Sequence, residues 1–154
     1  MNFGTRFGFF SVLVTVLFVL AACGGGNGGD TGSVSTDHTI QSDEGAFAFQ
    51  QESIAVPVGE EVSVTFENVS GVQHNLVLVR GGDDVAATVN TDGNAVGAPS
   101  YLPEDQANII AATSMLDGGG NETITFTIDE PGEYKYICTY PGHYPSMVGT
   151  LTAE

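Results

Sequence analysis

Basic side chains are scarce in this chain. Only 3 of its 154 residues are Lys or Arg, against 19 Asp and Glu, and the formal net charge is −16. A surface with this charge excludes nucleic acid binding and electrostatic attachment to anionic lipid, because both partners are themselves polyanions. The acidic excess fits solubility, salt adaptation or the steering of a basic partner, and the sequence leaves these alternatives open.

Cysteine and histidine are rare as well. The chain contains two cysteines, Cys23 and Cys138, and three histidines, His38, His74 and His143. A disulfide is common in exported domains, but here each cysteine has a better separate role. His38 stands in a polar segment apart from the other metal-binding residue types, and we expect it to be solvated.

Long hydrophobic runs are absent except near the N-terminus. Arg6 precedes a nearly unbroken apolar run over residues 7–22, which is shorter than the ~20 residues that span a bilayer. A positive start, a short apolar core and small residues at the end predict a secretory signal peptide, residues 1–22. The run ends in Leu-Ala-Ala-Cys, which resembles the lipobox of bacterial lipoproteins and implies acylation of Cys23.

Glycines follow Cys23 closely, and residues 23–44 are expected to form a flexible tether. A Gly-rich linker of this length has a root-mean-square reach of ~25 Å. We therefore expect an exported protein that a lipid anchors to the outer, periplasmic face of the cell membrane. The folded domain is expected over residues 45–154.

Short segments with period-two alternation fill this domain and indicate β-strands. Turn sequences rich in Gly, Pro, Asn and Asp separate them. The expected strands are 46–50, 53–58, 61–68, 74–80, 123–129, 133–138 and 148–153. This pattern favours an all-β Greek-key sandwich. Residues 81–120 interrupt it: Asp83 and Asp84 favour the start of a short helix, whereas 107–116 fits either a strand or a helix.

One loop concentrates metal-binding chemistry. Cys138, His143 and Met147 fall within ten residues, and His74 stands far upstream in a polar break before an apolar run. Two imidazoles, a thiolate and a weak axial thioether are the ligands of a blue-copper electron-transfer site. Each residue alone is more simply explained as a packed or hydrogen-bonded side chain, but the four together favour a metal. Zinc is the alternative, and the thioether favours copper.

The segments around these residues resemble the cupredoxins, the small blue-copper proteins, and among them most the auracyanins. The resemblance covers roughly residues 45 to 153 and rests on segments 73–79, 81–87 and 136–144. The Cys-x₄-His-x₃-Met spacing from Cys138 to Met147 is instead similar to that of azurins. The resemblance implies a cupredoxin-like fold with a short helical excursion between the two ligand-bearing halves.

The resemblance also implies the ligand roles. One type 1 copper ion is expected to take equatorial bonds from His74 Nδ1, Cys138 Sγ and His143 Nδ1, and a long axial bond from Met147 Sδ. The carbonyl of Gln73 is expected to approach the metal from the other side, as a backbone oxygen does in azurins.

Five nearby residues are expected to support the site. Asn75 and Thr139 are candidates to tie the two ligand segments together through hydrogen bonds near the cysteine sulfur. Pro141, Tyr144 and Pro145 are expected to ring an exposed edge of His143 and form the contact patch for electrons.

The predicted function is electron transfer by a protein that is not an enzyme. Three histidines are too few for a copper oxidase or nitrite reductase, which needs further metal centres. The chain is expected to be a monomeric, membrane-tethered carrier that serves redox proteins, membrane complexes among them, in a photosynthetic or respiratory chain. The alternative is a copper-handling protein, a chaperone or store, on the cell surface.

Overall fold

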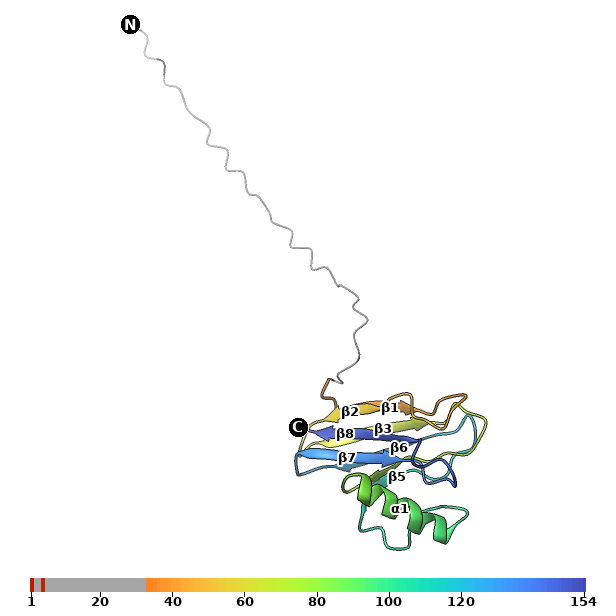
Figure 1. Ribbon diagram of the computed structural model, residues 1–154. Coiled ribbons are helices and arrows are strands. Elements are labelled where there is room, and N and C mark those ends of the chain that lie inside the picture. Colours follow the sequence, from red (N-terminus) through yellow and green to blue (C-terminus); the bar gives the residue numbers. More distant parts are fainter. Residues whose placement is uncertain (2–3, 5–32) are drawn as a thin grey trace.

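The computed structural model describes residues 1, 4 and 33–154 (Figure 1). Apart from residues 1 and 4, the expected signal peptide lies outside the described residues, as do Cys23 and the glycines after it. The remaining chain forms one folded unit from residue 37 to residue 153.

In this part of the chain, eight strands form two sheets. The first sheet has the order β1-β3-β6, with bounds Asp37–Gln41, Glu61–Glu67 and Asn121–Thr127. The second has the order β2-β8-β7-β4-β5, with bounds Ser53–Val56, Val148–Ala153, Gly132–Ile137, Val77–Val79 and Ile109–Ala112. The pairs β1–β3 and β2–β8 are parallel and the others antiparallel. This arrangement confirms the predicted all-β Greek-key sandwich.

The main core lies between the two sheets. Along β3, Val62, Val64 and Phe66 are at most 2% exposed, because the period-two alternation turns every second side chain inward. From the second sheet, Tyr136 and Leu151 join the same apolar cluster. Cys138 and Met147 belong to this cluster too, so two of the predicted ligands lie at the edge of the rigid core.

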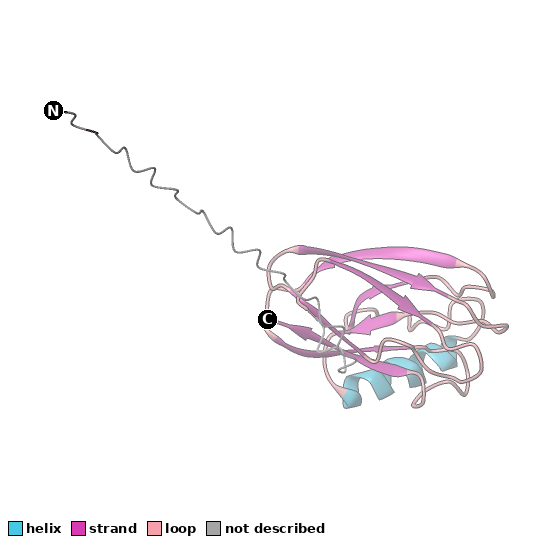
Figure 2. Ribbon diagram, turned by 90° about the horizontal axis from the view of Figure 1, so that it is seen from above, coloured by secondary structure: helices cyan, strands magenta, loops and turns pink. Residues whose placement is uncertain are grey.

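Within residues 33–154, a single α-helix, α1 (Asp83–Val96), packs on the outer face of the five-stranded sheet (Figure 2). Its Ala86 and Val89 form a second apolar cluster with Val77, Val79 and Ile137. The helix begins at Asp83 and Asp84 and has 14 residues, which confirms the predicted short helical excursion. Among the described residues, no helix is long and apolar enough to cross a membrane.

The folded domain begins earlier than residue 45. Residues 37–41 belong to the expected tether, yet they form β1 because Ile40, 1% exposed, enters the core and the backbone pairs with β3. His38 is therefore not simply solvated. Its Nε2 hydrogen-bonds the carbonyl oxygens of Ser35 at 2.9 Å and Ala55 at 3.0 Å, which links β1 to β2.

Two further predictions concern the loop after β1 and the ambiguous segment 107–116. The strand expected over residues 46–50 is a loop, and only Phe49 forms an isolated bridge, to Ser42. The ambiguous segment 107–116 contains strand β5, which pairs with β4.

Candidate metal centre

The two ligand segments are fixed by neighbouring parts of the second sheet. Cys138 directly follows β7, and His74 lies three residues before β4, the strand that pairs with β7. The backbone of His74 is held on its other side by Leu116, through N–H to O=C bonds of 3.1 and 2.8 Å in the two directions. Two residues that are 64 positions apart are thereby brought to one end of the sandwich.

Backbone turns close the loop between Cys138 and Met147. The N–H of His143 donates to the carbonyl of Tyr140 at 3.1 Å, and Gly142 has φ 83°. Pro at the second position and a positive φ at the third are typical of a type II turn, in which Gly avoids the strain of a Cβ. The N–H of Cys138 then donates to the carbonyl of Met147 at 3.2 Å, so both ends of the loop are pinned.

Three donor atoms face one point inside this loop. The Nδ1 atoms of His74 and His143 are 3.0 Å apart, and Cys138 Sγ lies 3.7 Å from the first and 3.5 Å from the second. All three side chains are at most 3% exposed. Donors bound to one ion at about 2.0–2.3 Å lie roughly 3–4 Å from one another. The residues present therefore fit a single metal ion.

Met147 is the buried methionine of the folded part. Its side chain is 0% exposed and packs in the same cluster as Cys138. Met115, the other methionine of the folded part, is half-buried and lies outside both apolar clusters. The burial of Met147 and the bond from the Cys138 N–H to its carbonyl favour Met147 over Met115 as the axial ligand.

Burial sets the protonation of the donors. It lowers the pKa of His74 to about 4, with the nearby charge of His143 as the second cause, and it lowers the pKa of His143 as well. It raises the pKa of the Cys138 thiol to about 11, although N–H groups of Asn75 and Tyr140 that hydrogen-bond the sulfur oppose the shift. At neutral pH both imidazoles offer lone pairs, whereas the thiol must lose its proton to a metal.

Asn75 and Thr139 connect the two ligand segments. The Asn75 amide donates to Thr139 Oγ1 at 2.8 Å and its Oδ1 accepts the Thr139 N–H at 2.9 Å. Both side chains are fully buried. From the other side, Asn94 Nδ2 of α1 donates to the Thr139 carbonyl at 3.1 Å. The residue next to Cys138 is thus held by the sandwich and by the helical excursion, and Asn94 was not expected from the sequence.

His143 is covered, not exposed. Its side chain is 3% exposed, and the ring of Phe47 stacks on it with centroids 4.1 Å apart and planes 19° apart. Tyr140 contacts the imidazole at 4.8 Å and contacts Tyr101 in turn at 5.5 Å. The exposed part of the ring is therefore smaller than expected, because Phe47, an aromatic residue from the loop before β2, covers one ring face.

The three residues expected to form the contact patch differ in position. Pro141 and Pro145 are exposed, but Tyr144 is half-buried against the cluster under α1. Its hydroxyl lies 3.4 Å from the carbonyl of Asp83. No local pattern in the sequence pointed to Phe47 or Tyr101, since both reach the site from distant segments.

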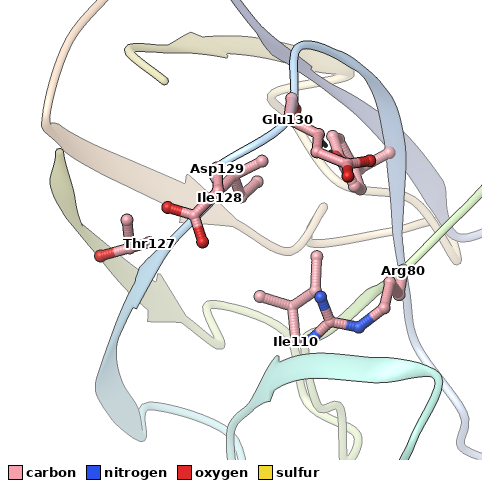
Figure 3. A pocket seen from close by; sticks show the side chains of 7 residues that line it. Arg80, Ile110, Thr127, Ile128, Asp129 and Glu130 are labelled. Atoms are coloured by element: carbon pink, nitrogen blue, oxygen red, sulfur yellow. Dashed lines mark hydrogen bonds between the residues drawn. The ribbon is translucent and has the colours of Figure 1, made fainter. Parts of the chain in front are cut away.

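Two further features concern the surface, and the approach of the Gln73 carbonyl to the metal stays a prediction. Gln73 is exposed, and its amide donates to Asp117 Oδ1 at 2.7 Å. A depression of about 260 Å³ is lined by Arg80, Ile110, Thr127, Ile128, Asp129, Glu130 and Tyr134 (Figure 3). None of these residues is a predicted metal ligand, so this depression adds nothing to the metal centre.

Comparison with known proteins agrees with this geometry. Residues 36–154 match the family described as copper-binding proteins, plastocyanin/azurin family. The chain is 41% identical to auracyanin-A of Chloroflexus aurantiacus, over 94% of each chain. It is 50% identical to auracyanin-B of the same organism, over 70% of this chain and 47% of that protein.

The solved structures give the same result. A dithionite-reduced auracyanin from the photosynthetic bacterium Roseiflexus castenholzii superposes with a TM-score of 0.78 and 48% identity, over 79% of this chain and 99% of the other.

Proposed function

Because the chain belongs to the plastocyanin/azurin family of copper-binding proteins, we propose that it is a blue-copper electron carrier that stays tethered to a membrane. The cofactor is copper, as the family and the donor set indicate. Proteins of this family transfer electrons and are in general not enzymes. His74, Cys138 and His143 would hold the ion equatorially, Met147 would be the weak axial ligand, and the Gln73 carbonyl stays a candidate for the opposite side.

One observation carries this proposal. Two imidazole nitrogens and one sulfur lie 3.0–3.7 Å apart, buried, beside a buried methionine. This combination of nitrogen, thiolate and thioether donors is the one that suits a copper ion in electron transfer. When bound, copper supplies a one-electron couple between Cu(I) and Cu(II).

The protein's own contribution is a rigid, dry site. The donors stand on a sheet end and on a loop that is pinned at Cys138 and Met147, so their positions change little between two oxidation states. Backbone N–H groups of Asn75 and Tyr140 that hydrogen-bond the sulfur stabilise the thiolate. Phe47 and Tyr140 flank His143 and keep water away from it.

The membrane tether belongs to the same proposal. The Leu-Ala-Ala-Cys sequence after an apolar run supports cleavage of residues 1–22 and acylation of Cys23. Two or more acyl chains anchor a protein stably, whereas one holds it only marginally. The anchored, monomeric domain would face the periplasm and exchange electrons with redox proteins, membrane complexes among them.

The relatives support the setting. Their names place auracyanins in photosynthetic bacteria, and on this basis we place the chain in a photosynthetic or respiratory electron-transport chain.

A visible spectrum tests the proposed function. The purified, copper-loaded protein should absorb strongly in the visible through charge transfer from the Cys138 sulfur, and Cys138→Ser should abolish the band. A colourless wild type that binds zinc more tightly than copper would overturn the proposal. Rapid exchange of copper without a persistent blue colour would instead favour the copper-handling alternative.

A further inference from the structure

Phe47 combines two properties that seldom occur together. Its side chain is 48% exposed, which is unusual for a phenylalanine in a folded domain. Yet its ring is not free, because it lies nearly parallel to the imidazole of His143 with 4.1 Å between the centroids. One face of the ring meets solvent and the other covers a metal donor.

The loop that carries Phe47 is built to hold it in place. Its ends are joined by the bridge between Ser42 and Phe49 and by the bond from the Asp43 N–H to the Ala48 carbonyl, 2.9 Å. Asp43 Oδ1 accepts the N–H groups of Gly45 at 2.8 Å and Ala46 at 2.9 Å. The Ala48 N–H donates to the Ala46 carbonyl at 2.9 Å, which puts Phe47 at the centre of a three-residue turn.

The two imidazoles are held by different contacts. His74 is fully buried in the folded part, so packing fixes its ring. Metal-binding histidines usually have the second ring nitrogen hydrogen-bonded, which fixes the ring orientation. Among the described residues, neither imidazole has this bond: His74 Nε2 is buried without a partner, and His143 has hydrogen-bond partners only for its backbone and Nδ1. Its ring orientation therefore depends on neighbouring rings: Phe47 stacks on it, and Tyr140 and His74 contact it at a tilt.

We propose that Phe47 is a positioning residue of the copper centre. Its stacked ring fixes the orientation of the His143 imidazole, and it excludes water from the outer side of the site. The inference rests on the proposed function, because it assigns Phe47 a role toward the bound metal. Phe47, on the loop between β1 and β2, is then the aromatic residue that covers the outer side of the site, in place of Tyr144.

Three variants separate stacking from simple burial. Phe47→Leu keeps an apolar side chain but removes the aromatic face, Phe47→Ala opens the site to water, and Phe47→Tyr keeps the stack. Val72→Ala is the matched control, because Val72 is a neighbouring apolar residue with a similar exposure of 46%. Each variant is loaded with copper and compared with the wild type.

Copper release gives the first measurement. Aromatic stacking contributes a moderate energy, so loss of copper to an excess of chelator should be about twofold to tenfold faster in Phe47→Leu. Phe47→Ala should also shift the reduction potential downward, because water near the site favours the more highly charged oxidised form. Phe47→Tyr should restore both values, and Val72→Ala should change neither.

A measurement without metal keeps this test separate from the proposed function. In the metal-free protein, the carbon-bound ring protons of His143 should resonate upfield in the NMR spectrum through the ring current of Phe47, and Phe47→Leu should remove this shift. Absence of the shift would overturn the proposal, as would release rates and potentials that are equal in Phe47→Leu, Val72→Ala and the wild type. A colourless wild type with a normal ring-current shift would overturn only the function.

Discussion

At the residue scale, each donor has a surrounding that suits its role. His74 is uncharged at neutral pH because burial lowers its pKa, and Cys138 accepts hydrogen bonds that favour the thiolate a metal needs. Met147 has no polar partner to satisfy and lies fully buried among apolar side chains. A thioether in such a place can act as a weak ligand without a cost in desolvation.

Replacement of Met147 should therefore tune the site. Met147→Leu nearly conserves volume, so it should change the free energy of unfolding by less than about 1.5 kcal/mol. It should retain copper and raise the reduction potential, because it removes a donor that favours Cu(II). Voltammetry and the visible spectrum measure both effects. If Met115→Leu shifted the potential and Met147→Leu did not, the wrong methionine would have been assigned.

The buried imidazoles also make the stability of the metal-free protein depend on pH. The folded-state pKa of His74 is about 4, below its usual value of 6.5, so the unfolded chain binds more protons between these two pH values. Stability is then fully present above about pH 6.5 and falls as the pH approaches 4, by at most about 3 kcal/mol for this group. His143 acts in the same direction.

Denaturant unfolding of the metal-free protein at several pH values measures this slope. His74→Gln removes one of the two groups and should flatten the slope in part. An unfolding free energy that is constant from pH 7 to pH 4.5 would contradict the assignment of uncharged, buried imidazoles.

At the element scale, strands β7 and β8 together position Cys138 and Met147. They pair from Gly132↔Ala153 to Ile137↔Val148, and Cys138 and Met147 continue the pair as hydrogen-bonded neighbours. Within the pair, Gly149 lies opposite Tyr136, whose ring occupies the space that a side chain at residue 149 would need. The tyrosine hydroxyl donates to the Gln51 carbonyl, so the ring cannot move freely.

A methyl group at this position should disturb the core. Gly149→Ala would place a Cβ inside the ring of Tyr136 and should destabilise the fold by about 1–3 kcal/mol through overpacking. Gly71→Ala is the control, because no atom lies within 4 Å of its Cβ position. Thermal unfolding compares the two. Equal melting temperatures for Gly149→Ala and Gly71→Ala would show that the β7–β8 pair is looser than described.

The strands also show which elements can be predicted from the sequence. Period-two alternation predicts β3, β6 and β8 well, because each buries every second side chain. Strand β7 is also predicted, although it buries Tyr136 on one face and Ile137 on the other. Strand β1 escapes the pattern, since only Ile40 of its five residues is buried and its neighbours are polar. The alternation in residues 46–50 is misleading in the opposite way: Phe49 enters the core, whereas Phe47 turns to His143.

The residues of the metal centre also differ in whether the sequence predicts them. Local spacing places three donors on one loop, and the polar break at residue 74 identifies the fourth. Phe47, Asn94 and Tyr101 reach the loop from three distant segments. Such contacts arise from the packing of the whole chain, and no periodicity encodes them.

At the scale of the whole molecule, the two ends of the sandwich differ. Strand β1 runs from Asp37 toward the loop that bears Phe47, so the chain enters at the end opposite the metal centre (Figure 1). The five residues of β1 span ~17 Å at 3.3–3.4 Å each. The C-terminal residue lies at the entry end as well, where the Glu154 N–H donates to the Val56 carbonyl at 3.0 Å. A tether that joins at residue 37 would leave the metal centre facing away from its anchor.

An anchor at Cys23 then has a consequence that is independent of the metal. Cys23→Ser should prevent acylation, so the protein should appear in the soluble exported fraction or remain uncleaved, with its copper spectrum intact. Cys138→Ser is the matched control: it should lose the blue band and remain in the membrane fraction, because the two sulfur atoms have separate tasks. Fractionation and mass spectrometry of the N-terminal peptide measure both variants.

If the native protein were fully soluble with Cys23 unmodified, the anchor would be wrong. The copper site would be unaffected, because its donors all lie within residues 74–147.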